Sequence, residues 1–279
     1  MSDARIAAAS GDGALAAAAV LVEVEGIDKA FPLGRKGTLQ ALQGVSLSMR
    51  QGELVAVVGP SGCGKSTLLR IIAGLEAPDA GTVRIGGRSA AQLTAEHRLG
   101  VAFQDHALLP WLTVAQNIAL PYRLAGRAVD HQRVERLATL VGLRDFTGSH
   151  PRELSGGMRQ RVSIARAIAL EPELLLLDEP FGALDLVTRR NLNQEMQSLW
   201  ATLGTTTLLI THSVEEAVQL ADRVLIMAAR PGRIHQGFDI DLPRPRDRAV
   251  ANSLEFLRLV QAVSSSLDEA SAASAGAAG

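Results

Sequence analysis

A glycine-rich stretch, Gly59 to Thr67, carries residue types that bind phosphate. It reads Gly-Pro-Ser-Gly-Cys-Gly-Lys-Ser-Thr and contains the pattern G-x-x-x-x-G-K-[ST] between an apolar run, Leu54 to Val58, and a helical stretch. Its glycines let backbone N–H groups point inward around a polyphosphate, and the positive end of the helix that opens at Lys65 joins them. Lys65 brings a charge to the outer phosphates, and the Ser66 hydroxyl is placed to coordinate Mg²⁺. The stretch therefore predicts nucleotide binding.

Composition limits the class of protein. Cys63 is the only cysteine among 279 residues, so no disulfide can form within the chain, and with no evident base beside it we do not predict a nucleophile. A formal net charge of −1 argues against a mainly electrostatic nucleic-acid binder. No apolar run approaches the ~18 residues of a membrane span, and Ser10 to Gly13 interrupts the alanine-rich N terminus. We expect a cytoplasmic protein without a signal peptide.

The chemistry-bearing residues stand at the ends of predicted strands. Four apolar runs predict these strands: Leu54 to Val58, Leu99 to Phe103, Leu174 to Leu177 and Thr206 to Ile210. The residues at or just beyond their ends are Gly59, Gln104, Asp178 and His212. Helices between the strands imply a largely parallel α/β sheet with right-handed crossovers, and ligands bind such sheets at the carboxyl ends of the strands.

The remaining segments supply helices and half-exposed strands. Alternating residues predict strands at 22–27, 45–49 and 82–85. From residue 105 to 152 the pattern is helical, and Thr113 and Asp130 are the predicted N-caps. Ser155 is the predicted N-cap of a third helix, and further helices are expected at 186–203 and 214–220.

A second motif gives the family resemblance. Leu154-Ser-Gly-Gly-Met158, placed ahead of Asp178-Glu179, resembles the signature sequence of ATP-binding cassette ATPases, the engines of ABC transporters. The resemblance covers about residues 21 to 240. It implies an α/β P-loop NTPase fold, an ABC cassette with a RecA-like core, an antiparallel β subdomain and a helical signature subdomain. We predict a disordered tail at 1–19, an ATPase domain at 20–248 with the helical subdomain at about 105–160, and at 249–279 a C-terminal helix with a disordered tail from Ser264.

The resemblance assigns nucleotide contacts residue by residue. Phe31 resembles the aromatic that stacks on adenine, although a Phe packed under the sheet edge is the alternative. Gln104 resembles the glutamine that reaches Mg²⁺ and the attacking water. The residues predicted to bind ATP are Phe31, Gly59, Pro60, Ser61, Gly62, Cys63, Gly64, Lys65, Ser66, Thr67 and Gln104.

The predicted catalytic residues are Glu179, His212 and Lys65. Asp178 closes a buried strand and is expected to hold Mg²⁺ together with Ser66 and Gln104. Glu179 resembles the residue that orients or deprotonates the water attacking the γ-phosphate, with a pair of solvated acids as the alternative. His212 matches the switch histidine that contacts the γ-phosphate. The other five histidines are interpreted as surface or loop residues.

Ser155, Gly156 and Gly157 form a second predicted anion site at a helix N-terminus. In the family this site completes the ATP pocket of the opposite subunit, so the resemblance implies a homodimer that closes head to tail on ATP. Asp185 belongs to a loop that resembles the one joining the two sites. Met158 departs from the glutamine often found there, but we expect little loss of chemistry.

Three further segments concern transport. Leu108 to Leu112, with Trp111, either forms a transporter-coupling surface or packs inside the helical subdomain. The stretch Gln104 to Leu112, the turn Ala229 to Arg233 and the segment Asp241 to Arg248 together resemble importer ATPases for nitrate, taurine and aliphatic sulfonates. Without the family, the turn is a hairpin and the last segment a solvated linker. The resemblance implies separate transmembrane permease subunits, a solute-binding protein, no nucleic acid, and a peripheral place on the cytoplasmic face of the inner membrane.

We therefore predict the ATP-hydrolysing subunit of an importer for a small anionic or heteroaromatic solute, with ATP and Mg²⁺ as cofactors. One alternative is a soluble cassette ATPase acting on DNA or ribosomes; such proteins commonly carry two cassettes or a long inserted arm. The other is a small-molecule kinase, which would leave the site at Ser155 and the position of His212 unexplained.

Overall fold

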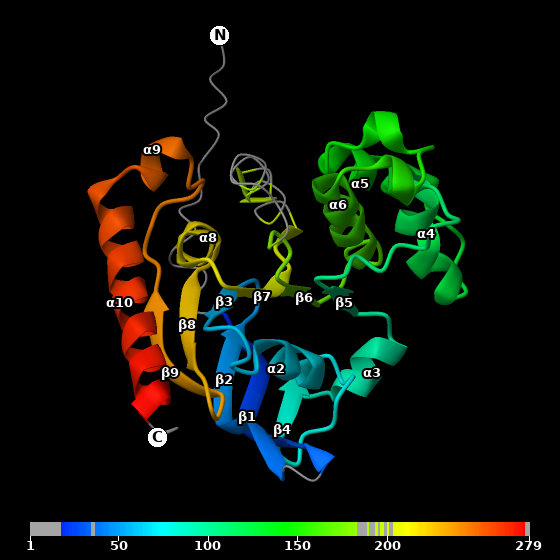
Figure 1. Cartoon of the computed structure of the whole chain (residues 1–279). Helices are drawn as coiled ribbons and strands as arrows, with labels where there is room; N and C mark the ends of the chain where they lie inside the picture. The colour runs from blue at the N-terminus through cyan, green and yellow to red at the C-terminus, as the bar shows by residue number, and fades with distance from the viewer. Residues whose placement is uncertain are drawn as a thin grey trace.

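Two β-sheets enclose the helix that follows the glycine-rich loop (Figure 1). The structure, a computed structural model, describes residues 18–34, 37–182, 189, 193–194, 196–197, 200 and 203–276. The larger sheet has the strand order β5-β6-β7-β3-β8-β9. Its strands are β3 (Leu54–Val58), β5 (Leu99–Ala102), β6 (Leu174–Asp178), β7 (Thr206–Thr211), β8 (Arg223–Ala228) and β9 (Arg233–Asp239). All pairs are parallel except β8 with β9, which confirms the largely parallel sheet.

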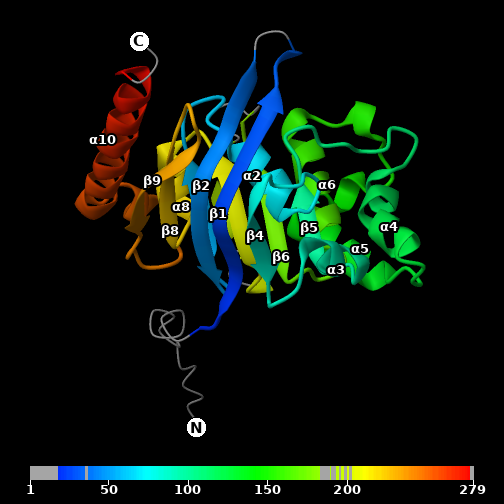
Figure 2. The ribbon, with the colours of Figure 1, turned by 90° about the horizontal axis from the view of Figure 1, so that it is seen from below.

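The smaller sheet is antiparallel and has the order β2-β1-β4. Its strands are β1 (Val20–Pro32), β2 (Thr38–Arg50) and β4 (Ala80–Ile85). Figure 2 shows this sheet lying across α2 (Lys65–Ile72) and the larger sheet. One hydrophobic cluster joins the three layers: it holds Val24 from β1, Leu69 from α2 and Val57 from β3. Helix α3 (Ala90–Ala95) closes its rim with Leu93.

A second hydrophobic cluster covers the opposite face of the larger sheet. Strands β3 and β6 are buried along their whole length because both faces are covered, as their continuous apolar sequence predicted. The helices on this side include α4 (Val114–Leu124), α5 (His131–Leu140), α6 (Gly156–Ala167), α8 (Val214–Leu220) and α10 (Leu254–Gly276). The short helices are η2 (Arg144–Phe146), η3 (Pro151–Glu153) and α9 (Arg248–Ala251).

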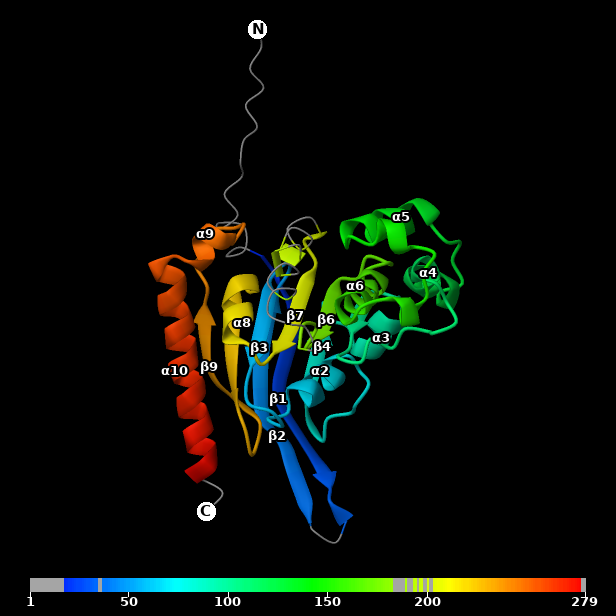
Figure 3. The same ribbon diagram turned by 45° about the horizontal axis from the view of Figure 1, so that its top comes forward.

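Helices α4, α5 and α6 form a group beyond β5, on the side away from α10 (Figure 3). The predicted N-caps are confirmed: Thr113, Asp130 and Ser155 each accept a hydrogen bond from a backbone N–H three residues on. Helix α6 begins inside the predicted helical subdomain, continues unbroken to Ala167 and packs on α4. The Tyr122 hydroxyl of α4 donates to the Ala169 carbonyl just after α6.

The predicted disorder of the C-terminal segment from Ser264 is wrong as far as Gly276. Helix α10 runs to Gly276, and Val263 and Ala270 have no exposed surface. The alanine and serine side chains of α10 are small, so the helix packs closely on β8. From the sequence, these small residues suggested too little buried surface for an ordered structure. Of the predicted N-terminal tail, only Ala18 and Ala19 lie among the described residues. The Ala19 carbonyl accepts a hydrogen bond from the Gln51 N–H.

The segment Asp241 to Arg248 is solvated only in part, because Leu242 and Arg246 are buried while its other six residues are exposed. Arg246 is 1% exposed, and its guanidinium donates to the carbonyls of Val218, Ala221 and Ile240. Its backbone N–H and C=O exchange hydrogen bonds of 2.7 and 2.9 Å with the amide of Gln197. A buried arginine is tolerated because carbonyl oxygens satisfy its donors. The segment therefore ties the end of α8 to β9.

Two other predictions concern a long helix and membrane spans. Most of the helix predicted at 186–203 falls on residues that the structure does not describe, but the described residues of this range are helical: 189, 193–194, 196–197, 200 and 203. In the part of the chain that the structure describes, no helix is both long and apolar enough to cross a membrane.

Candidate active site

The glycine-rich loop joins the end of β3 to the start of α2. Gly62 and Gly64 have φ values of 76° and 98°, in the left-handed region that favours glycine. A Cβ at Gly64 would also lie 2.6 Å from Leu42 Cδ2, so the position has no room for a side chain. Gly64 caps α2 without a side-chain hydrogen bond. The first N–H groups of α2 are therefore available to an anion.

Lys65 lies beneath this loop. Its side chain is buried, and Nζ donates to the carbonyls of Gly59 at 2.8 Å and Pro60 at 3.1 Å. The neighbouring Cys63 is 1% exposed, and burial raises the pKa of its thiol against the opposing charge of Lys65. A buried thiol with a raised pKa is a poor nucleophile, which agrees with the prediction that Cys63 does not act as one.

Ser66 and Asp178 meet where β6 ends beside α2. The Ser66 hydroxyl donates to Asp178 Oδ1 at 3.0 Å, and burial raises the pKa of the Asp178 carboxyl. Within the described residues, no group of three His, Cys, Asp or Glu side chains could hold a metal. The donors present suit Mg²⁺ nonetheless, because this ion is typically held by one or two protein oxygens together with phosphate oxygens and water.

Two predicted residues, Gln104 and His212, converge on the carboxylate of a third, Glu179, and the three follow different strands. Glu179 Oε2 lies 3.4 Å from Gln104 Nε2, which donates to it, and 3.5 Å from His212 Nδ1. The Glu179 N–H donates to the Ile210 carbonyl of β7, which fixes the residue between β6 and β7. Its φ of 46° is unusual for a residue with a side chain. The result is a partly exposed carboxylate that can accept a proton from water.

A cavity of about 400 Å³ runs past Gln104 and Glu179, whereas His212 is not among its lining residues. Its lining consists of Phe31, Leu39, Gln40, Ala41, Ser61, Gly62, Gly64, Lys65, Ser66, Thr67, Gln104, Glu179 and Arg230. Phe31 lies at this cavity and is not packed beneath the sheet, although stacking on adenine stays a prediction. The Lys29 ammonium lies 5.2 Å from the centre of its ring.

Four lining residues escaped sequence reasoning: Leu39, Gln40, Ala41 and Arg230. The first three lie on β2, and Leu39 pairs directly with Phe31. A prediction that β1 and β2 form a hairpin would have placed Leu39 beside Phe31. Arg230 lies in the turn between β8 and β9, and nothing in its local sequence indicates that this turn reaches the phosphate loop.

Comparison with known proteins decides the family. A family model described as ABC transporter matches residues 42–182. The aliphatic sulfonates import ATP-binding protein SsuB of Bacillus subtilis is 48% identical over 222 residues, which are 79% of this chain and 85% of that protein. The chain belongs to the ATP-binding cassette family of ABC transporters. As a member of this family it is an ATPase.

Other relatives agree with this assignment. The taurine import ATP-binding protein TauB of a Jannaschia species is 46% identical to the cassette over 217 residues, 77% of this chain and 80% of that protein. A solved ATP-binding cassette, in a dimeric post-hydrolysis state bound to ADP and Pi, superposes with a TM-score of 0.69 at 31% identity. That match covers 79% of this chain and 99% of the other. The predicted fold class is confirmed.

The second predicted anion site lies outside the cavity. None of Ser155, Gly156 and Gly157 is among the lining residues described above. Ser155 is exposed, and its hydroxyl accepts from the Met158 N–H at 3.2 Å. Asp185, the predicted link between the two sites, lies outside the described residues.

His106, interpreted from the sequence as a surface or loop residue, touches the signature helix. Its Nε2 lies 3.1 Å from the Gly156 carbonyl. Arg166 of α6 donates to the carbonyls of His106 and Ala107, each at 2.7 Å. These contacts attach the segment that follows Gln104 to the helix that begins at Gly156.

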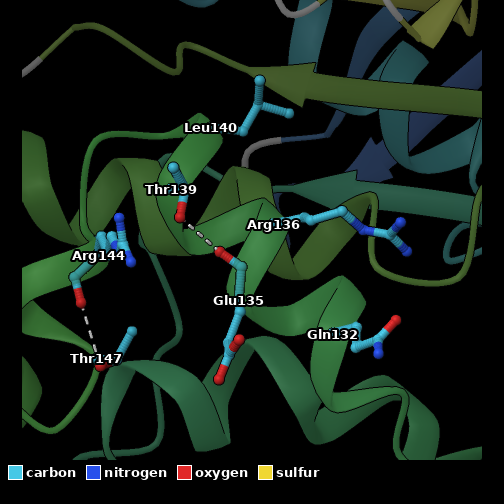
Figure 4. A pocket seen from close by; sticks show the side chains of 7 residues that line it. All are labelled: Gln132, Glu135, Arg136, Thr139, Leu140, Arg144 and Thr147. Carbon is cyan, nitrogen blue, oxygen red and sulfur yellow. Dashed lines mark hydrogen bonds between the residues drawn. The ribbon is translucent and has the colours of Figure 1, made fainter.

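A larger cavity, of about 680 Å³, lies in the helical subdomain (Figure 4). Side chains of α5 and of the segment around η2 line it: Gln132, Glu135, Arg136, Thr139, Leu140, Arg144 and Thr147. The hydroxyls of Thr139 and Thr147 donate to backbone carbonyls of Glu135 and Arg144. This cavity has neither the glycine loop nor the Glu179 carboxylate of the smaller one, so its greater volume does not make it the ATP site.

Proposed function

We propose that this cassette hydrolyses ATP at sites shared between two copies of the chain and thereby drives import of a small organic sulfonate. The convergence of Gln104, Glu179 and His212 beside the Ser66–Asp178 pair carries the hydrolytic part of the proposal. The identity of 46–48% with ATPases named for the import of aliphatic sulfonates and taurine supports the choice of solute. Nitrate, also suggested by the sequence resemblance, is the alternative solute.

Each residue at the site has a proposed task. The glycine-loop N–H groups and Lys65 hold the phosphates. Ser66 and Asp178, with Gln104, would hold Mg²⁺, which when bound would neutralise charge on the phosphate oxygens. Glu179 accepts the proton of the attacking water, while Gln104 and His212 orient its carboxylate and the water. Phe31 stacks on adenine.

The position of the signature motif supports a shared site. Ser155 begins α6 with its side chain exposed, and the motif does not line this chain's own cavity. The N-terminus of a twelve-residue helix favours an anion, so an ATP held by a second copy would complete it. The solved cassette described above is itself dimeric. We therefore propose a head-to-tail homodimer in which the loop that contains Asp185 links the two sites.

The segment from Leu108 to Leu112 supports docking to a membrane subunit. Leu108 packs against the helical subdomain, whereas Trp111 is 69% exposed and therefore accessible to a partner. The buried Asn117 amide holds the segment by hydrogen bonds to the carbonyls of Leu109 and Leu112. A rigidly held, exposed Trp suits a protein interface. We propose that a separate permease docks here, which places the cassette on the cytoplasmic face of the inner membrane.

Purification of the tagged protein from its native membranes in mild detergent tests the transport proposal. A multi-span permease should co-purify in stoichiometric amount, and Trp111→Ala should weaken its recovery. Leu254→Ala is the control, because Leu254 is 64% exposed, close to the value for Trp111, but lies on α10. Recovery of ribosomal or DNA-associated proteins without a permease would overturn transport and favour a soluble cassette ATPase.

The solute is tested with the reconstituted complex and its solute-binding protein. Taurine or an aliphatic sulfonate should stimulate ATP hydrolysis, and nitrate should not. Stimulation by nitrate alone would refute the sulfonate assignment while leaving the importer function intact.

A further inference from the structure

The turn between β8 and β9 is pinned against the phosphate loop. The Gly232 N–H donates to the Ala41 carbonyl at 3.0 Å, and the Gln43 N–H donates to the Gly232 carbonyl at 2.9 Å. A Cβ at Gly232 would lie 2.2 Å from the Cys63 carbonyl oxygen, so only glycine permits this approach. The turn is therefore held between β2 and the phosphate loop.

This turn presents Arg230 to the ATP cavity. Arg230 is exposed and lines the cavity together with Phe31 and Lys65. Its φ of 57° lies in the left-handed region, which side-chain-bearing residues adopt at an energetic cost. Strain of this kind at a ligand cavity, in a turn fixed on both sides, indicates that the position of the side chain matters.

The charged side chains that line the cavity indicate that Arg230 is available to bind phosphate. Among the lining residues, Lys65 and Arg230 are the positive side chains, and Glu179 is the negative one. Lys65 Nζ already donates to two loop carbonyls. No hydrogen bond or ion pair joins the Arg230 guanidinium to any residue that the structure describes. A guanidinium without protein partners beside a polyphosphate cavity has the geometry and charge for bidentate phosphate binding.

Helix α10 braces the same turn. The Ala229 N–H donates to Ser274 Oγ at 3.2 Å, and that hydroxyl donates to the Ala270 carbonyl at 2.7 Å. Ser274 is buried, so the contact is shielded from water. In Figure 1, α10 runs beside β8 and β9. The C-terminal helix therefore positions Arg230 through Ala229.

We infer that Arg230 is a nucleotide-binding residue whose guanidinium contacts the phosphates of ATP from the turn that is pinned beside the glycine loop. The turn rests on Ala41, which lies between the Phe31 end of the cavity and the phosphate loop. Arg230 therefore reaches the phosphates nearest the sugar. This inference rests on the nucleotide site proposed above.

Calorimetric titration of the full chain with ADP tests the inference. Arg230→Ala should weaken ADP binding about fivefold to tenfold, as expected for a charge-assisted hydrogen bond in a partly exposed site. Arg230→Lys should restore part of the loss. Arg233→Ala is the matched control: Arg233 is exposed at the other end of the turn but does not line the cavity, and its affinity should match the wild type. Thermal melts should show that all variants fold.

Two further readouts separate binding from structure. In steady-state hydrolysis, Arg230→Ala should raise KM for ATP with little change in kcat, because the contact is made equally in the ground and transition states. Raising the salt concentration should narrow the affinity gap between the wild type and Arg230→Ala.

The outcomes distinguish this inference from the site itself. If the wild type binds ADP and both Arg230→Ala and Arg233→Ala bind it with the same affinity, the role of Arg230 is overturned. The proposed nucleotide site then still stands. An affinity gap that salt leaves unchanged would overturn the phosphate contact. A wild type that does not bind ADP would overturn the proposed nucleotide site as well.

Discussion

At the scale of single residues, Glu179 has the clearest consequence for chemistry. Glu179→Gln keeps the size of the side chain but cannot accept a proton, so ATP binding should persist while turnover falls by about 10²-fold or more. ATP binding by filtration and phosphate release under single-turnover conditions measure the two quantities. Glu215→Gln, on an exposed carboxylate of α8, should leave both unchanged. Near-normal hydrolysis by Glu179→Gln would refute the assignment.

Glu216 makes stability depend on pH. The side chain is 3% exposed, and burial raises the pKa of its carboxyl from 4.5 to about 7, against the hydrogen bond from Thr211 and the charge of Arg189. Below pH 4.5 both folded and unfolded chains hold the proton. Between 4.5 and about 7 only the folded chain holds it, so the contribution of Glu216 to stability falls as pH rises through this window.

Glu216→Gln removes this titration. The difference in unfolding free energy, variant minus wild type, should therefore rise between pH 4.5 and about 7 and then level off, with a total change of about 3 kcal/mol. Urea unfolding at a series of pH values measures it. A difference that stays constant with pH would show that Glu216 titrates alike in the folded and unfolded chains.

At the scale of elements, Arg246 joins α8, β9 and Gln197. Arg246→Met should lower the free energy of unfolding by about 3 kcal/mol, because the buried carbonyls at the end of α8 lose their donors. Arg248→Met is the control, since Arg248 lies two residues further on and is exposed. Urea midpoints compare the two variants. Equal midpoints would mean that water or a shifted side chain satisfies these carbonyls.

Elements also decide where the chemistry gathers. Strands β5, β6 and β7 are parallel neighbours, so the residues that follow them meet at one edge of the sheet. Gln104, Glu179 and His212 reach that edge from segments far apart in the chain. Helix α8 begins two residues after His212, and Arg246 holds its other end. The predicted switch histidine, His212, therefore lies just before a helix whose far end is fixed by Arg246.

At the scale of the whole molecule, the exposed signature motif predicts that ATP causes dimerisation. Glu179→Gln loaded with ATP and Mg²⁺ should sediment as a dimer, and without nucleotide as a monomer. Adding Ser155→Asp should abolish the dimer while retaining ATP binding. Asp remains a good N-cap for α6 but places a negative charge against the partner's phosphates. Glu179→Gln that remains monomeric with ATP at high concentration would count against the shared site.

The sequence by itself determined the phosphate loop and the strand ends. A glycine pattern between an apolar run and a helix dictates local backbone geometry, and parallel strands bring Gly59, Gln104, Asp178 and His212 to one edge. The N-caps at Thr113, Asp130 and Ser155 were equally predictable, because capping depends on a side chain and an N–H three residues away. The roles of the site residues stay predictions until the variants are measured.

Only the tertiary structure decided the features that depend on contacts between distant segments. Arg246 appeared solvated in a run of prolines and arginines, but carbonyls from α8 and β9 bury it. The alanines and serines of α10 suggested disorder, whereas their small size fits the surface of β8. Arg230 reaches the ATP cavity because Gly232 packs on Cys63 and Ala41. In each case the free energy comes from partners that no local window of sequence contains, so only the folded chain could show them.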